Sequence, residues 1–149
     1  MANYSFFFLR LYFIADVLGA VAFTAYKTTS EYISMDEIAW FDETMTNIGG
    51  HFNPATSSFV CPYHGVYMFS FTFNADTGDA VHLGIKRNDT LFVTAQADIT
   101  NDSKTTGSAV VVLECGPSQV VWVQCTHEGD LFGGGNRKTH FTGALLHAF

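Results

Sequence analysis

The sequence predicts an all-β fold in which two antiparallel sheets form a sandwich. In the segment Val66–Phe73, aromatic residues alternate with smaller ones. This alternation places Tyr67, Phe69 and Phe71 on one side of an extended chain and favours a half-buried strand. Short apolar segments recur between turn signals, and no segment has the period of a long amphipathic helix. These observations are typical of a β-sandwich whose aromatic face meets a second sheet.

Ten short strands are expected, separated by residues that favour turns. Strands of this length at this spacing are typical of an all-β sandwich. The predicted strands are Phe23–Lys27, Trp40–Met45, His51–Phe52, Phe59–Val60, Val66–Asn74, Ala80–Arg87, Leu91–Ala97, Gly107–Glu114, Gln119–Thr126 and Thr139–His147.

Turn chemistry dominates the approach to the aromatic strand. Gly49-Gly50 and Asn53-Pro54 surround the short strand at His51. Pro62 and Gly65 then separate the next short apolar segment from the aromatic strand. We therefore expect several tight turns before the chain enters the core.

The second half of the chain contains two continuous apolar segments. Hairpin turns are predicted at Asn88-Asp89 and at Gly116-Pro117, and a polar loop at Asn101–Thr106. The segments Val110–Leu113 and Val120–Val123 are apolar without alternation, as in strands that are buried on both faces. We expect each to be central in its sheet, covered by the other sheet and by a neighbouring subunit.

The composition favours association with other subunits. Only 14% of the 149 residues are charged, against roughly 25% in ordinary soluble proteins, and 15 are Phe. So few charges suggest that other subunits cover part of the surface. The net charge of −7 and the scattered basic residues argue against nucleic acid as a partner, because phosphate binding requires clustered Lys and Arg.

Three cysteines permit at most one disulfide within the chain. In the hairpin register expected at Gly116-Pro117, Cys115 lies opposite Val120, so a disulfide between Cys115 and Cys125 is not expected. The pairing among Cys61, Cys115 and Cys125 is otherwise open. No Cys or His spacing indicates a zinc site.

Residues 1–22 are predicted to be a signal peptide, with the domain at 23–149. Arg10 and Asp16 would lie within the hydrocarbon of a membrane span, and the uninterrupted apolar runs are too short to cross it. Ala20 and Ala22 give the A-x-A pattern that precedes a cleavage site. The alternatives are an extra apolar strand or a wrongly defined start of the reading frame.

The segment Asn47–Phe73, NIGGHFNPATSSFVCPYHGVYMFSFTF, resembles the signature of the complement C1q globular-head domain. Segments beginning at Ala22, Gln119 and Thr139 resemble three further parts of that domain, in the correct order. The residues that carry the resemblance are Gly50, Phe52, Pro54, Phe59, Pro62, Gly65, Tyr67, Phe69, Phe71, Trp122, Phe141, Gly143 and Leu145.

This resemblance implies a ten-stranded jelly-roll sandwich, a fold that the family shares with the tumour necrosis factor superfamily. It also implies a tight homotrimer, secretion and a binding role without catalysis. The chain contains no collagen-like Gly-X-Y triplets, so it resembles a head-only member of the family.

Calcium is a possible cofactor, because some members of the family bind it in loops rich in Asp. The corresponding loop here offers Asp98 and Asp102 as ligands. Calcium takes six to eight oxygens, so carbonyl groups, waters or sister subunits would have to complete its shell. The alternative is a solvated polar loop, and no other cofactor is expected.

Other motifs were tested for chemistry. Asn88 and Asn101 each begin an N-glycosylation sequon in a predicted loop. The six His residues lack metal-binding spacing, and no nucleophile motif is present, so we do not expect an enzyme. Aromatic residues in or beside the loop Thr28–Ala39 either stack on carbohydrate or anchor the loop. These residues are Tyr26, Tyr32, Trp40 and Phe41.

Two functions follow as hypotheses. The first is a secreted trimeric recognition domain that binds microbial carbohydrate, lipopolysaccharide or another extracellular ligand in innate immunity. The alternative is an extracellular signalling or structural ligand, similar to cerebellin or a cytokine, that binds a cell-surface receptor. The sequence does not identify the ligand.

Overall fold

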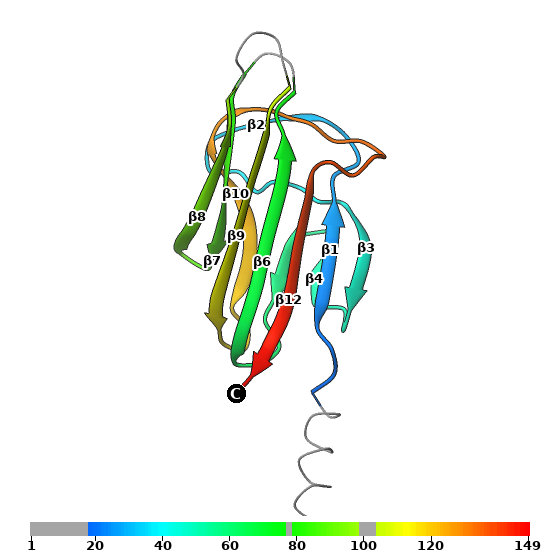
Figure 1. Ribbon diagram of the computed structural model, residues 1–149, viewed down its shortest axis with the longest axis vertical. Coiled ribbons are helices and arrows are strands. Elements are labelled where there is room, and N and C mark those ends of the chain that lie inside the picture. Colours follow the sequence, from blue (N-terminus) through cyan, green and yellow to red (C-terminus); the bar gives the residue numbers. More distant parts are fainter. Residues whose placement is uncertain (1–17, 77–78, 99–103) are drawn as a thin grey trace, which may run out of the picture.

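Twelve strands form in the computed structural model, which describes residues 18–76, 79–98 and 104–149 (Figure 1). All of the pairings between these strands are antiparallel. The strands are β1 (Ala22–Tyr26), β2 (Glu31–Ile33), β3 (Glu43–Ile48), β4 (Phe52–Asn53), β5 (Ser58–Val60), β6 (Gly65–Asn74), β7 (Val81–Arg87), β8 (Thr90–Ala97), β9 (Thr106–Cys115), β10 (Val120–His127), β11 (Gly129–Leu131) and β12 (His140–Ala148).

The strands form two five-stranded sheets that face each other. The first sheet has the order β3-β1-β12-β6-β9 and the second has the order β4-β5-β10-β7-β8. Figure 1 shows the first sheet in front of the second, with β1 and the C-terminus at the same end of the sandwich. No helix in the described residues is long and apolar enough to cross a membrane.

The prediction of an all-β sandwich is confirmed, and all ten predicted strands are present. Sequence reasoning missed β2 and β11, which form a separate two-stranded sheet. Strands of three residues are too short to show alternation, so their pairing with each other was not visible in the sequence. The predicted strand Trp40–Met45 was placed about three residues too early, because β3 spans Glu43–Ile48.

The predicted hairpin at Gly116-Pro117 is wrong. β9 pairs with β6 in the first sheet, whereas β10 lies between β5 and β7 in the second. The turn therefore connects the two sheets. The expected central position holds for β10 but not for β9, which lies at the edge of its sheet and leaves Val110 and Val112 61% and 56% exposed in the single chain.

Aromatic residues of β6 form the centre of the core. Tyr67, Phe69, Phe71 and Phe73 all point inward, and none is more than 1% exposed. Burying one such ring contributes about 1.5–3 kcal/mol to folding. The alternation predicted from the sequence therefore places the largest apolar side chains of the strand between the two sheets.

Ring contacts join the two sheets. Phe23 of β1 lies 4.7 Å from Phe52 of β4 and 5.1 Å from Phe59 of β5, measured between ring centroids. Phe141 of β12 meets Phe23 edge to face at 4.9 Å. Gly143 faces this cluster, and a Cβ atom there would overlap the Phe23 ring. Any larger residue at Gly143 would have to displace an aromatic ring of the core.

The other residues of the predicted signature occupy turns and strand ends. Gly50 has a φ of +71°, a left-handed conformation that favours glycine. Pro54 and Pro62 are half-buried in the segments that follow β4 and β5. Gly65 begins β6 where a Cβ atom would overlap the backbone of β12, and Leu145 is half-buried on β12.

A buried disulfide joins Cys61, directly after β5, to Cys115 at the end of β9. It is therefore a covalent link between the second sheet and the first. The sequence left this pairing open, and the expectation that Cys115 and Cys125 are not bonded is correct. Cys125 is a free, buried cysteine, and burial raises the pKa of its thiol to about 11.

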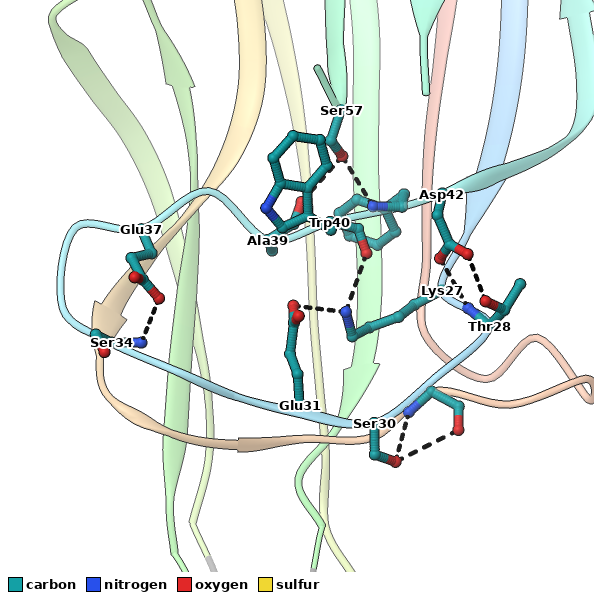
Figure 2. A network of polar contacts seen from close by, with 12 residues as sticks. Lys27, Thr28, Ser30, Glu31, Ser34, Glu37, Ala39, Trp40, Asp42 and Ser57 are labelled. Atoms are coloured by element: carbon teal, nitrogen blue, oxygen red, sulfur yellow. Dashed lines mark hydrogen bonds and ion pairs between the residues drawn. The ribbon is translucent and has the colours of Figure 1, made fainter. Parts of the chain in front are cut away.

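Polar contacts anchor the loop that links β2 to β3. Lys27 is only 2% exposed, and its Nζ lies 2.5 Å from Glu31 Oε1 and 3.4 Å from the carbonyl oxygen of Trp40 (Figure 2). The ammonium group therefore ties the start of the loop to its end.

Two further groups complete this anchor. Thr28 donates hydrogen bonds from its backbone N and its hydroxyl to the Asp42 carboxylate. Desolvation opposes ionisation of Asp42, but the hydrogen bonds from Thr28 outweigh it and lower the pKa of this carboxyl. The buried Ser57 hydroxyl accepts from Phe41 N and donates to the Ala39 carbonyl, as Figure 2 shows.

Replacing both bonded cysteines, in C61A/C115A, should lower the free energy of unfolding by about 4 kcal/mol, because the disulfide closes a 54-residue loop. Urea unfolding followed by tryptophan fluorescence at constant protein concentration measures this change. C125A is the matched control, because it truncates a buried thiol that forms no disulfide. Equal losses in the two variants would contradict a stabilising role of the disulfide.

E31Q should lower the free energy of unfolding by about 2 kcal/mol, because it leaves the Lys27 ammonium buried without its carboxylate. The loss should be smaller than in a fully buried pair, since about a third of the Glu31 side chain is exposed. K27M/E31Q, which removes both charges, should recover most of the stability. A double variant less stable than E31Q would show that the ion pair is not the reason.

Candidate recognition surface on the second sheet

The exposed apolar side chains of the described residues fall on two faces of the molecule. Single exposed apolar residues are ordinary, but groups of them indicate contact surfaces. The first group lies on strands of the first sheet and at the C-terminus: Met45, Ile48, Val110, Val112, Leu146 and Phe149. The second group lies on β2, the following loop and the second sheet: Tyr32, Met35, Trp40, Val60, Leu91 and Phe92.

A row of side chains crosses the outer face of the second sheet. On β10, Val121 and Val123 are buried in the core, so Trp122 points outward and is half-buried. Trp122 lies opposite Ser58 of β5 on one side and Lys86 of β7 on the other. Lys86 in turn lies opposite Leu91 of β8.

Trp40 stands beside this row. Ala39 donates its N–H to the carbonyl of Val123 over 2.9 Å, so the loop runs along β10 where β5 has ended. Ala39 and Phe41 are buried, which leaves Trp40 pointing outward, 42% exposed. Ser57 hydrogen-bonds the residues on both sides of Trp40 and fixes it next to the start of β5 (Figure 2).

Hydrogen bonds fix the Trp122 indole. Its Nε1 donates to Gln124 Oε1 over 3.1 Å, and Gln124 Nε2 donates to Asp36 Oδ1 over 3.3 Å. Asp36 and Ser57 have φ values of +67° and +50°, which are uncommon for residues other than glycine. Both residues with this unusual backbone hold a tryptophan in place. We call Trp40, Trp122, Gln124, Lys86 and Leu91 the indole surface.

Positive charge lies over the aromatic rings of this face. Lys86 Nζ is 5.8 Å from the Trp122 ring centroid, and Arg87 Cζ is 4.8 Å from that of Phe92. Within the described ranges, no carboxylate forms an ion pair with Lys86. Such cation–π contacts contribute about 0.5–1 kcal/mol at exposed sites. The charge of Lys86 is therefore available to a ligand.

The surroundings of Tyr32 have the opposite charge. Desolvation and the neighbouring carboxylates of Glu128, Asp79 and Asp130 raise the pKa of this phenol. A ligand that carries negative charge would be repelled there and attracted at Lys86.

The aromatic residues beside the first long loop divide between the two proposed roles. Phe41 is fully buried and anchors the loop, and Tyr26 is half-buried with the Arg137 guanidinium 4.9 Å from its ring. Trp40 and Tyr32 are exposed and available for contact. Sequence reasoning treated Trp122 only as part of the scaffold. Its alternation with Val121 and Val123 was the signal that it points outward.

The described residues do not form a calcium site at Asp98. Its Oδ1 lies 2.9 Å from His82 Nε2, and its Oδ2 accepts a hydrogen bond from Gln96 Nε2 over 3.1 Å. Calcium requires a shell of oxygens, whereas these partners are nitrogen donors. Asp102 lies outside the described residues, among which no group of three His, Cys, Asp or Glu could hold a metal.

The two predicted glycosylation sites differ in what can be said of them. Asn88 is exposed in the turn between β7 and β8, and its Oδ1 accepts a hydrogen bond from Val120 N over 3.0 Å. Its Nδ2, the atom that would carry a glycan, is therefore on an accessible residue, and glycosylation there stays a prediction. Asn101 lies outside the described residues.

Comparison with known proteins identifies the family. The family model described as C1q domain matches residues 22–146. A polypeptide of the mouse complement C1q subcomponent is 27% identical over 124 residues, which cover 83% of this chain and 49% of that protein. Mouse complement C1q tumor necrosis factor-related protein 7 is 30% identical over 111 residues, covering 72% and 37% respectively. The chain thus spans about half the length, or less, of these relatives.

Solved structures share the fold. The globular domain of zebrafish complement 1qA superimposes with a TM-score of 0.74 at 17% identity, covering 87% of this chain and 99% of that one. Eiger, a tumour necrosis factor from S. frugiperda, superimposes with a TM-score of 0.72 at 13% identity, covering 88% and 95%. The predicted jelly-roll sandwich and the predicted family are both confirmed, and the chain belongs to the C1q-domain family.

Proposed function

We propose that this chain is the recognition domain of a secreted, homotrimeric and non-enzymatic protein that binds microbial polysaccharide, lipopolysaccharide or another extracellular ligand. Membership of the C1q-domain family supports a binding role. The observation that carries the proposal is the uncharged outer face of the first sheet, which leaves the indole surface of the second sheet free for a ligand.

Register across the first sheet supports self-association. One apolar row crosses all five strands: Ile48, Ala22, Ala144, Met68 and Val112. The next row carries hydroxyl groups and one valine: Thr46, Thr24, Thr142, Ser70 and Val110. Neither row contains a charge. A face of this kind has the composition of the core of a subunit interface.

The ends of this face also suit a covering subunit. β9 is an edge strand with exposed valines, and such edges are normally covered or charged in stable monomers. At the end of the face where β1 begins, a groove of about 730 Å³ is lined by residues 18–22 and 144–148, most of them apolar. A sister subunit would bury both features.

The chemistry of the cysteines supports secretion and a non-enzymatic role. The Cys61–Cys115 disulfide is typical of oxidising compartments. The thiol of Cys125, with its raised pKa and full burial, is unsuited to act as a nucleophile. In this proposal the signal peptide is 1–22. Cleavage after Ala22 would remove one hydrogen bond, from Leu145 N to the Val21 carbonyl, at the edge of the domain.

The purified protein should bind immobilised lipopolysaccharide or whole bacteria, and free polysaccharide should compete for that binding. A glycan array, read with and without calcium, then tests the ligand and the cation together. Binding to animal cells that polysaccharide does not reduce would contradict this function. It would instead favour the alternative, a signalling or structural ligand of a cell-surface receptor.

Sedimentation equilibrium at micromolar concentration should show a trimer, and V112K should shift it toward monomer. The reason is that this lysine would place three charges in the proposed interface, while Val112 is exposed enough in the single chain for the fold to tolerate it. T94K, on the outer face of the second sheet, is the matched control and should remain trimeric. A monomeric wild-type protein would contradict the proposal.

A further inference from the structure

We propose that the indole surface binds an acidic saccharide, a sugar chain whose units carry a carboxylate or a phosphate. Trp122 and Trp40 would each lie against a sugar ring, and Lys86 would pair with the acidic group. This inference rests on the proposed recognition function, to which it adds the site and the chemical class of the ligand.

The two indoles supply flat apolar area on one face. The C–H face of a pyranose ring is apolar while its rim carries hydroxyl groups, so it complements a tryptophan with polar neighbours. Trp40 stands beside the start of β5, and Ser58 of β5 lies opposite Trp122. Ser58 therefore separates the indoles by about two strand spacings, or about 10 Å. This separation fits a chain of sugars better than a single ring.

Polar groups around the indoles suit the rim of a sugar. The Ser58 hydroxyl lies 2.7 Å from the Thr56 hydroxyl, and Thr94 is exposed on β8 opposite Gly84. Hydroxyl groups can donate and accept, as sugar hydroxyls do. Gln124 uses its amide to fix the Trp122 indole, so the stacking surface is held in place before a ligand arrives.

Charge distinguishes an acidic saccharide from a neutral one. The Lys86 ammonium lies at the Trp122 ring and has no ion-pair partner in the described part of the chain. Arg87, the next residue, adds a second positive charge near Phe92 while its Nη1 donates to the Glu114 carbonyl. The whole chain carries a formal net charge of −7, so two adjacent cations on this face stand out. They attract an anion to the edge of the stacking site.

The test uses the full secreted protein and two pairs of probes. Oligogalacturonate and its methyl ester have the same rings with and without the carboxylates. A phosphorylated mannan and its dephosphorylated form do the same for phosphate. The wild-type protein should bind at least one acidic probe at least tenfold more tightly than its neutral partner, and W40A and W122A should weaken that binding.

K86Q should lower affinity for the acidic probe about tenfold and leave binding of the neutral probe unchanged. K138Q is the matched control, since it removes one exposed positive charge from another part of the chain and should bind as the wild type does. Sedimentation confirms that each variant is assembled. W40A keeps the test decisive if W122A fails to fold, because Trp40 belongs to a loop.

Failure can be assigned to one proposal or the other. If the wild type binds acidic saccharide and both K86Q and W40A bind it equally well, the site is wrong while the recognition function stands. If the wild type prefers the neutral probe of both pairs, the ligand class is wrong. If it binds no saccharide on probes or array, both the inference and the proposed glycan recognition fall.

Discussion

The inward aromatic face of β6 is the constraint on which the rest of the structure depends. Tyr67, Phe69, Phe71 and Phe73 fill the space between the sheets, and rings from β1, β4, β5 and β12 close around them. A slip of one residue in the register of β6 would turn all four rings to the outside. Burial of this stripe therefore fixes the register with β12 and β9, and with it the outer face of the first sheet.

The same alternation creates both proposed contact surfaces. On the first sheet, the positions opposite to the aromatic stripe are Val, Met, Ser and Thr, which leaves a face without charge. On the second sheet, burial of Val121 and Val123 turns Trp122 outward. Each functional face is thus the reverse side of a core-forming strand. A substitution that changes the outward residue can alter binding without disturbing the core behind it.

The sequence revealed local periodicity but not which strands are neighbours in space. Alternation located β6 almost to the residue, because each inward ring is its own evidence. The turn at Gly116-Pro117 was misread as a hairpin because adjacency in sequence was taken for pairing, and the chain instead crosses to the other sheet. The Cys61–Cys115 disulfide and the exposure of Trp40 depend on that crossing and on loop contacts, which no single segment encodes.

A shallow sheet face is a weak binding site in isolation, since it buries little of a ligand. In the proposed trimer, three copies of the indole surface would belong to one rigid particle. A repeating polysaccharide could engage several of them, and linked binding of this kind can exceed single-site affinity by about 10²–10⁴-fold. The uncharged first sheet and the indole surface then act together. The first makes the particle, and the particle makes a shallow, charge-selective surface sufficient for recognition of a repeating ligand.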